Sequence, residues 1–419
     1  MTITADAGTT TLDLGPARAL TCRECGNQIP LAPEFACSEC FGPLEVSYEF
    51  GDVTRAEIEA GPRSIWRYRG LLPVPSDVDR HPNTEPGLTR LVKADRLGAA
   101  LGMKSLWVKD DTGNPTHSFK DRVVGVALAA ARQLGFRVLA CPSTGNLANA
   151  VAAAAARAGW ESVVLIPSSL ERAKILTTAV YDGALIAVDG NYDDVNRLAT
   201  ELAAEHEDWA FVNVNVRPYY AEGSKTLGYE VAEQLGWRLP DQVVVPIASG
   251  SQLTKVDKGF RELIDLGLVD GRPYRVFGAQ ATGCSPVAAA YKAGHDVVTP
   301  VKPDTIARSL AIGAPADGPY VLDVVRRTGG AVENVSDDEV VAGIRLLART
   351  EGIFAETAGG VTVATAKKLI ETGQLDPEAE TVLLITGDGL KTLDAVQDKV
   401  GPRATVPPSA AAVREALAD

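Results

Sequence analysis

The chain has 419 residues, 46% of them hydrophobic, which is enough for roughly two or three domains with large apolar cores. The formal net charge is −13, from 41 basic and 54 acidic residues, so we expect no binding to nucleic acid or to anionic membranes. Residues 1–12 lack the basic start and apolar core of a secretion signal, and no apolar run approaches the roughly 18 residues of a membrane span. We therefore expect a globular protein of the cytoplasm.

Four of the six cysteines lie close together near the start of the chain. Cys22 and Cys25 form one CxxC pair, Cys37 and Cys40 form a second, and 11 residues separate the two pairs. This spacing predicts a zinc ribbon at 18–48, because tetrahedral zinc takes four thiolates and each CxxC turn supplies two of them. Such a zinc ion has no open position for a substrate, so its role would be structural. The alternatives are reducible disulfides or four thiols without metal.

Beyond a Pro-rich, irregular passage at 61–87, within a lead-in at 60–99, apolar strand patterns alternate with helical ones. Continuous apolar strands joined by helices are typical of parallel sheets covered on both faces, so the expected fold class is α/β. We expect a smaller α/β domain at 100–219, a larger one at 220–404 and a C-terminal tail at 405–419. The expected strands cover 106–109, 138–141, 163–166, 185–188, 210–214, 243–247, 275–279 and 382–386. The expected helices cover 122–134, 148–158, 193–207, 254–266, 337–351 and 360–371.

Small, polar turns follow several of these strands, at the edge of the sheet where α/β proteins bind ligands. The most informative turn is HSFKDR at 117–122, which places Lys120 at the start of a long helix. The others are STGN at 143–146, ASGSQ at 248–252 and TGDGLK at 386–391. A lysine on the first turn of a helix is more often a solvated residue with a packed stem. The company of the other turns favours a reactive lysine in a ligand site.

These motifs, in this order, resemble those of the fold-type II pyridoxal-phosphate enzymes, and most closely those of the threonine synthases. The resemblance covers nearly the whole chain and rests on NPTHSFKDR at 114–122, STGN at 143–146, EGSKT at 222–226 and TGDGLK at 386–391. The cysteine quartet is also similar to the rubredoxin-type knuckle that some threonine synthases carry ahead of the catalytic region. The resemblance implies a tryptophan synthase β-like fold with two open parallel-sheet domains and a small N-terminal zinc ribbon.

The resemblance implies pyridoxal 5′-phosphate as cofactor, with Lys120 as the catalytic residue that forms a Schiff base with its aldehyde. An unperturbed lysine has a pKa of about 10.4, so Lys120 must be desolvated or lie near cations such as Arg122 to react as an amine. By resemblance, Asn146 contacts the phenolic oxygen of the cofactor and Thr386 faces its ring nitrogen. Asn146 could instead be a helix cap, and Asp388 could compete with Thr386.

Two further turns are suited to anions. Ser143, Thr144 and the backbone N–H groups that follow them form a cradle for the α-carboxylate of a substrate. The loop from 248 departs from the glycine-rich, asparagine-containing turn of many family members, but hydroxyls and N–H groups at a helix start still suit a phosphate monoester. The residues expected to hold the cofactor phosphate are Ser249, Gly250, Ser251, Gln252 and Leu253.

The resemblance also implies a second phosphate site, for the substrate. Asn215, Arg217 and Lys225 are the residues expected to form it. Tyr220 stands where an arginine is common in the family, and Arg217 is expected to compensate through a bidentate guanidinium–phosphate contact. The alternative for Arg217 is a surface arginine at the end of a strand. Leu147 stands where many threonine synthases have a threonine.

The expected function is that of threonine synthase, which converts O-phospho-L-homoserine and water to L-threonine and phosphate. We expect a homo-oligomer that acts on this small molecule. One alternative lies within the same class and comprises cysteate synthase and threonine or serine dehydratase; the need for a second anion site discriminates against it. Another is a non-catalytic, zinc-dependent interaction protein, which would hold no cofactor through a lysine.

Overall fold

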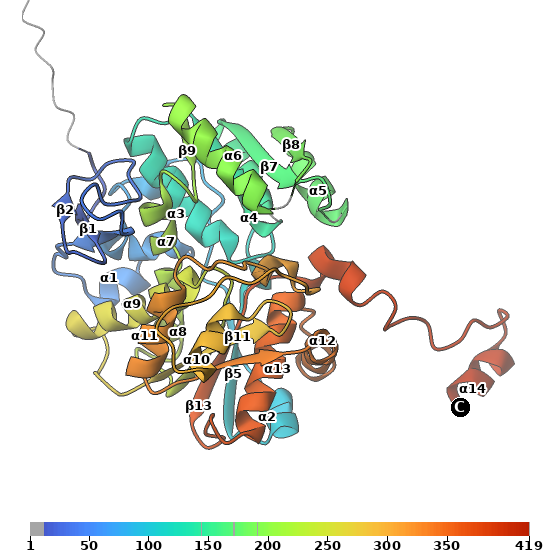
Figure 1. Ribbon diagram of the computed structural model, residues 1–419. Coiled ribbons are helices and arrows are strands. Elements are labelled where there is room, and N and C mark those ends of the chain that lie inside the picture. Colours follow the sequence, from blue (N-terminus) through green and yellow to red (C-terminus); the bar gives the residue numbers. More distant parts are fainter. Residues whose placement is uncertain (1–11, 144, 171, 191, 419) are drawn as a thin grey trace, which may run out of the picture.

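The computed structural model describes residues 12–143, 145–170, 172–190 and 192–418, and three β-sheets organise them. The first sheet is small and antiparallel and lies at one side of the molecule, in dark blue in Figure 1. Its order is β2-β1-β3, and the four clustered cysteines lie on β1 and in the turns beside these strands. The strands are β1 (Ala17–Cys22), β2 (Gln28–Ile29) and β3 (Leu44–Tyr48).

The second sheet has six strands in the order β12-β11-β10-β13-β5-β4. Neighbouring strands run parallel except β4, which is antiparallel to β5 at one edge. The central strands are almost entirely buried, as expected for strands covered by helices on both faces. The strands are β4 (Arg90–Lys93), β5 (Ser105–Asp110), β10 (Gln242–Pro246), β11 (Arg275–Ala281), β12 (Val332–Val335) and β13 (Glu380–Ile385).

Strand β5 lies in a different sheet from the one expected. The sequence assigned it to the smaller domain at 100–219, but β5 pairs with β13 along its whole length and so belongs to the six-stranded sheet. An apolar pattern indicates that a strand is buried but not which strand it pairs with, so the pattern did not locate β5. The remaining domain limits stay predictions.

The third sheet has four parallel strands in the order β8-β7-β6-β9. Burial decreases from β6, which is fully buried, to the edge strand β8, which is half exposed. All four strands were expected from the sequence, although β9 ends earlier than predicted. The strands are β6 (Val138–Pro142), β7 (Glu161–Pro167), β8 (Ala184–Val188) and β9 (Trp209–Phe211).

The described helices include all six that the periodicity predicted. The bounds of α12 agree with the prediction, because Ser336 and Glu339 form a capping box at its start. The α-helices are α1 (Arg55–Glu59), α2 (Asp95–Leu101), α3 (Lys120–Gln133), α4 (Asn146–Ala158), α5 (Arg172–Ala179), α6 (Tyr192–Glu205), α7 (Arg217–Glu222), α8 (Lys225–Gln234), α9 (Ser251–Asp265), α10 (Pro286–Lys292), α11 (Gly318–Arg327), α12 (Asp337–Glu351), α13 (Thr357–Glu371) and α14 (Ala410–Ala418). Short 3-10 helices are η1 (Ile65–Leu71), η2 (Val78–Arg80), η3 (Asp111–Gly113), η4 (Arg308–Leu310) and η5 (Gly389–Ala395).

Both parallel sheets pack against helices on two faces. Residues of α8 and α9 share one apolar core with the larger sheet, and residues of α12 and α13 share the other. The smaller sheet packs against α3 and α4 on one face and against α6 on the other. Leu20 and Val46 of the cysteine-rich segment lie in the same core as Val123 and Leu139, so this segment is anchored on the smaller sheet's side of the molecule.

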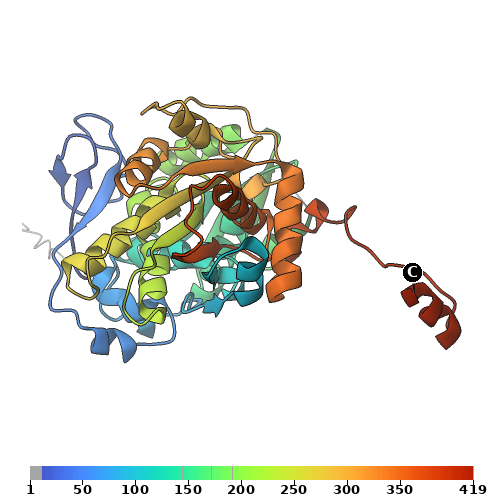
Figure 2. The same cartoon turned by 90° about the horizontal axis from the view of Figure 1, so that it is seen from below.

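The chain ends in a segment that is separate from the body of the molecule. Helix α14 stands apart from the sheets in Figures 1 and 2, and none of its described residues is buried. Within the described ranges, no helix has both the length and the apolar character needed to cross a membrane.

Candidate active site

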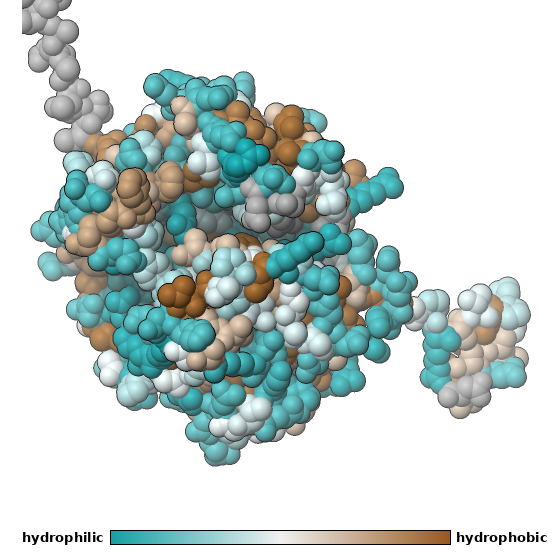
Figure 3. All heavy atoms as spheres, viewed as in Figure 1, coloured by the Kyte–Doolittle hydropathy of each residue, from teal (hydrophilic) through white to brown (hydrophobic). Residues whose placement is uncertain are grey.

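The carboxyl ends of both parallel sheets meet at a cavity of about 440 Å³. Pro142 ends β6 of the smaller sheet and Pro246 ends β10 of the larger one, and both line this cavity with the turns that follow them. Figure 3 shows the surface hollowed between the two lobes that contain these sheets. The turns predicted to bind a ligand therefore converge on one space.

Lys120 is the first residue of α3 and lines the cavity. Its Nζ donates a hydrogen bond to Tyr220 Oη at 2.8 Å and lies 4.7 Å from the centre of the Phe119 ring. Burial lowers the pKa of Lys120 to about 8, against the opposing effect of the Glu356 carboxylate. At neutral pH, a larger fraction of this amine is therefore uncharged and nucleophilic than in a lysine exposed to water.

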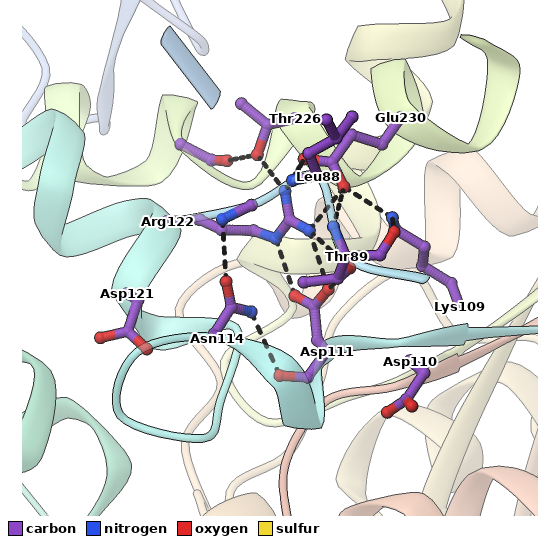
Figure 4. A network of polar contacts seen from close by, with 12 residues as sticks. Leu88, Thr89, Lys109, Asp110, Asp111, Asn114, Asp121, Arg122, Thr226 and Glu230 are labelled. Carbon is purple, nitrogen blue, oxygen red and sulfur yellow. Dashed lines mark hydrogen bonds and ion pairs between the residues drawn. The ribbon is translucent and has the colours of Figure 1, made fainter. Parts of the chain in front are cut away.

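Arg122 does not lower the pKa of Lys120, which corrects one expectation from the sequence. Its guanidinium is fully buried and engaged by carboxylates, with Nε 2.7 Å from Asp111 Oδ2 and Nη2 2.8 Å from Glu230 Oε2 (Figure 4). Lys109 Nζ donates to the same Glu230 carboxylate at 2.6 Å.

This buried network holds the start of α3 in place. Burial alone would raise the pKa of Glu230, but Arg122 and Lys109 hold it at about 2, so its carboxylate is charged. The paired groups come from α3, β5, η3 and α8, as Figure 4 shows. Arg122 thus fixes the helix that carries Lys120 and does not activate the amine directly.

The turn after β6 brings Ser143 and Asn146 to the cavity wall. Ser143 Oγ accepts hydrogen bonds from the backbone N–H groups of Gly145 and Ala148, each at 3.0 Å, which orders the start of α4. Gly145 has a φ of +141°, and a Cβ at this position would lie 2.5 Å from Lys174 Cδ, so the turn requires glycine. Thr144 lies outside the described residues.

Asn146 is held by Glu356, which the sequence did not indicate, and by Lys391, the last residue of the TGDGLK turn. Its Nδ2 donates to both carboxylate oxygens of Glu356, at 3.0 and 2.9 Å, and its Oδ1 accepts from Lys391 Nζ at 3.2 Å. Gly145, not Asn146, is the N-cap of α4, so the alternative of a capping asparagine does not apply. Glu356 also lines the cavity, but it is 210 positions away from Asn146, and no local pattern links the two.

The loop between β10 and α9 forms another part of the wall, with Ser249, Gly250, Ser251 and Gln252 lining the cavity. Gly250 has a φ of +99°, and a Cβ there would lie 2.7 Å from a methyl group of Val321. The first N–H groups of α9 have no partner within the helix and lie at the positive end of its dipole. The side-chain N–H₂ of Gln252 is buried and has no hydrogen-bond partner among the described residues.

The side chain of Leu253 is buried in the apolar core and does not line the cavity, so the role expected of this residue falls to its backbone N–H and stays a prediction. Thr386 follows β13 and does line the cavity. Its carbonyl oxygen accepts from the Phe119 N–H at 2.9 Å, which joins this turn to the one that carries Lys120. Asp388 is not part of the cavity wall, and its carboxylate caps η5 by accepting from the Leu390 N–H at 2.8 Å.

Arg217 is the one residue of the expected substrate-phosphate group that lines the cavity. It begins α7, and its Nη2 lies 2.8 Å from Asp317 Oδ2. The side chain of Arg217 is 26% exposed and lines the cavity. Asp317 is a further residue that the sequence did not indicate.

The structure does not bring Asn215 and Lys225 to the cavity. Asn215 Nδ2 donates to the Trp209 carbonyl at 3.0 Å, across the tight turn after β9. Lys225 is fully buried, and its Nζ donates to the Leu71 carbonyl at 2.9 Å and pairs with Glu262 at 3.0 Å. The resemblance implied that both residues contact the substrate phosphate, but their side chains make contacts elsewhere.

The four clustered cysteines form a compact group of sulfur atoms. All four are free thiols, which contradicts the disulfide alternative. Their Sγ atoms lie within 4.8 Å of one another, with Cys22 and Cys40 at 3.4 Å and Cys25 and Cys37 at 3.8 Å. A tetrahedron with zinc–sulfur distances of about 2.3 Å has sulfur atoms roughly 3.8 Å apart. The spacing of the thiols is therefore compatible with zinc.

Comparison with known proteins identifies the family. A family model described as pyridoxal-phosphate dependent enzyme matches residues 83–387, a span that contains the lysine turn and the other turns around the cavity. The chain belongs to this family.

Individual relatives agree with this assignment. Threonine synthase of Methanosarcina acetivorans is 36% identical over 404 residues, which are 95% of this chain and 98% of the relative. Threonine synthase of Methanocaldococcus jannaschii is 36% identical over 380 residues, which are 89% and 93% of the two chains. The solved structure of maize serine racemase shares the fold, with a TM-score of 0.63 over 77% of this chain and 95% of that one at 22% identity.

The residues of the cavity fit pyridoxal phosphate, the cofactor of this family. The desolvated, partly neutral amine of Lys120 suits the cofactor aldehyde. The start of α9 offers backbone N–H groups for the phosphate, and the side-chain amide of Gln252, which finds no acceptor in the described part of the chain, would gain one from an anion. The donor set therefore matches both ends of the cofactor.

Proposed function

We propose that this protein is a threonine synthase that converts O-phospho-L-homoserine and water to L-threonine and phosphate. The observation that carries this proposal is the similarity to two threonine synthases over nearly the whole chain, with the motif lysine in the wall of a cavity of suitable chemistry. Bound pyridoxal phosphate would supply the electron sink that makes the substrate's Cα–H and Cβ–H bonds acidic.

Lys120 is the residue that we assign to proton transfer. Its Nζ would accept the protons from Cα and Cβ of the substrate and, after phosphate leaves Cγ, return one proton to Cγ. A water molecule would then add its hydroxyl at Cβ and give its proton to the released phosphate, and Nζ would return the second proton to Cα. The neutral hydroxyl of Tyr220 holds Nζ in place by accepting its hydrogen bond at 2.8 Å. A pKa of about 8 suits this work, because the amine then accepts and releases protons near neutral pH.

The two ends of the substrate would be held on opposite parts of the wall. Ser143 and the N–H groups at the start of α4 are assigned to the α-carboxylate. Arg217 is assigned to the phosphate, because its guanidinium is the group suited to a phosphate monoester and lies outside the α9 loop assigned to the cofactor. Asn146 and Thr386 stay assigned to the phenolic oxygen and the ring nitrogen of the cofactor.

A dehydratase is the second candidate, and the partly exposed Arg217 side chain on the cavity wall argues against it. The relative kcat/KM of the purified enzyme for O-phospho-L-homoserine, O-phospho-L-serine and L-threonine tests the choice. We expect the first to be preferred by about a hundredfold or more, since it alone reaches both anion sites at the expected spacing. Preference for L-threonine, with ammonia release, would favour a dehydratase instead.

We also propose that the four cysteines bind one structural zinc ion. The support is the mutual distance of the sulfur atoms and the N–H donors from Glu24 and Glu39, each 3.4 Å from a cysteine sulfur. Metal analysis of protein purified under reducing conditions, without chelator, should give about one equivalent of zinc, and chelation should lower the thermal midpoint. Less than about half an equivalent would contradict a closed four-thiolate site.

The homo-oligomer, the absence of nucleic-acid binding and the cytoplasmic location remain predictions from the sequence. Light scattering of the purified protein measures the first of them. A charge of −13 is the argument for the second.

A further inference from the structure

The cysteine-rich segment, residues 18–48, borders the cavity as well as the core. Phe35, in the loop between its two CxxC pairs, forms part of the cavity wall. The hydroxyl of Tyr219, a residue of α7, donates to the Ala32 carbonyl at 3.0 Å. The segment therefore touches the helix whose first residue is Arg217.

Arg23 extends from this segment toward the same helix start. It lies inside the first CxxC pair, and its Nη1 is 3.3 Å from Asp317 Oδ1. The guanidinium also lies 3.5 Å above the ring of Tyr320, whose hydroxyl bonds to the neighbouring Glu24. Stacking and ion pairing together restrict Arg23 to one orientation.

Asp317 connects Arg23 to two parts of the cavity wall. One carboxylate oxygen accepts from Arg23, and the other lies 2.8 Å from Arg217 Nη2. The Asp317 backbone N–H donates to the Ser249 carbonyl at 2.9 Å. Its side chain is 7% exposed, so the carboxylate is screened only weakly by solvent.

The net charge of Arg23, Arg217 and Asp317 determines whether these side chains attract an anion. Arg217 and Asp317 alone form a neutral pair, which is a poor partner for phosphate. Arg23 shares the same carboxylate, so the three side chains carry a formal charge of +1. Glu24 lies next to Arg23 but is exposed, and solvent screens it more strongly than Asp317.

We propose that Arg23 is a positioning residue for the substrate phosphate: it holds and partly neutralises Asp317, so that Arg217 keeps its orientation and its capacity to bind a phosphate monoester. The cysteine-rich segment is thereby part of the substrate site as well as a structural module. This inference rests on the proposed function for the identity of the phosphate ester, but the ion-pair geometry carries the role of Arg23.

The test compares holoenzyme with the Arg23→Ala variant. Inorganic phosphate, titrated by calorimetry into enzyme saturated with cofactor, should bind about tenfold more weakly to the variant, the scale of coupling between neighbouring charges. KM for O-phospho-L-homoserine should rise by a similar factor while kcat and cofactor content stay unchanged. A fall in kcat with unchanged KM and unchanged phosphate affinity would overturn the proposal.

Two variants separate charge from general damage to the segment. Arg18→Ala removes another arginine–carboxylate pair of the same segment, with Glu49, on an exposed surface, and should change neither KM nor phosphate affinity. Arg23→Lys keeps the charge and should restore most of the phosphate affinity. If Arg23→Ala does not fold, Arg23→Gln takes its place, because glutamine keeps a hydrogen-bond donor of similar length without the charge. A phosphate affinity of Arg23→Gln equal to that of wild type would then overturn the role of the charge.

A double-mutant cycle tests the route through Asp317. In an Asp317→Asn background the Arg23→Ala change should have little further effect on phosphate affinity, because the shared carboxylate is already absent. An undiminished effect in that background would exclude the route. Calorimetry with inorganic phosphate gives its answer even if the wild-type enzyme does not form threonine, so failure of the proposed function is distinguishable from failure of this inference.

Discussion

At the scale of single residues, the environment of Lys120 explains its reactivity. The motif around Lys120 was sufficient to predict a ligand-site lysine, and it left desolvation and nearby cations open as causes of a lowered pKa. Desolvation is the cause, whereas Arg122 is paired with buried carboxylates. Tyr220, which bonds the amine, is 100 positions away, and Glu356 is 210 positions away from its partner Asn146. Contacts at such separations leave no pattern in a single sequence.

The lowered pKa of Lys120 predicts how cofactor uptake depends on pH. Only the neutral amine reacts with the aldehyde, so the rate at which cofactor-free enzyme takes up pyridoxal phosphate should rise about tenfold per pH unit below 8. The rate should level off above a pH of about 8. Stopped-flow absorbance of the cofactor measures it. A rate that keeps rising to about pH 10, the value for an unperturbed lysine, would show that burial does not control the amine.

At the scale of elements, strand-to-helix turns were the informative features. The sequence located the turns after β6, β10 and β13, because each combines an apolar strand with glycine and hydroxyl residues at a helix start. It did not predict α7 and α8, whose residues are nearly all buried although several of them are charged or polar. Lys225 on α8 was misplaced because a charged residue is ordinarily expected at a surface or a ligand site.

Ser251 and Arg217 are expected to serve two separate anion sites. If Ser251 donates to the cofactor phosphate beside several backbone N–H groups, Ser251→Ala should weaken cofactor affinity by about ten- to a hundredfold, since a bond to a charged acceptor contributes roughly 1.5–3 kcal/mol. Arg217→Ala should instead raise KM for the substrate and retain the cofactor. Each variant is titrated with pyridoxal phosphate and with O-phospho-L-homoserine. An Arg217→Ala enzyme that loses cofactor but keeps substrate affinity would reverse the two assignments.

At the scale of the whole molecule, buried charge joins elements that are distant in sequence. The α/β fold class follows from strand and helix periodicity, and the compact cysteine group follows from the cysteine spacing, whereas the two parallel-sheet domains were implied by the resemblance. The pairing of β5 with β13 did not follow from the sequence, because every buried strand of a parallel sheet has a similar apolar pattern. The sequence did not predict the buried charge network either, because charged residues are ordinarily assigned to the surface. This network consists of Arg122, Asp111, Lys109 and Glu230.

Breaking this network should destabilise the protein strongly. Glu230→Gln leaves Arg122 and Lys109 partly uncompensated, which should lower the free energy of unfolding by about 3–5 kcal/mol. Glu201→Gln, which breaks an exposed pair with Arg197, should cost less than about 0.5 kcal/mol. Denaturant unfolding of both variants measures the contrast.

The same carboxylate gives the contrast a pH dependence. The pKa of Glu230 is about 2 in the folded protein and higher, near its ordinary value, when the chain unfolds. The stabilisation of the fold by the Glu230 charge is therefore fully present at pH values above the ordinary pKa of a glutamate. It is lost as the pH falls through about 2, the pKa in the folded protein. The difference between wild type and Glu230→Gln should narrow toward that pH. Equal stability of the two proteins at neutral pH would show that the network does not hold α3.

The central claim is that Lys120, in this cavity, makes threonine from O-phospho-L-homoserine. The most direct measurement follows L-threonine and phosphate together in purified wild-type and Lys120→Ala proteins, both checked for folding by circular dichroism. Wild type should release the two products in equal amounts, and Lys120→Ala should be slower by several orders of magnitude. Substantial threonine formation by Lys120→Ala, or none by wild type saturated with cofactor, would contradict the claim.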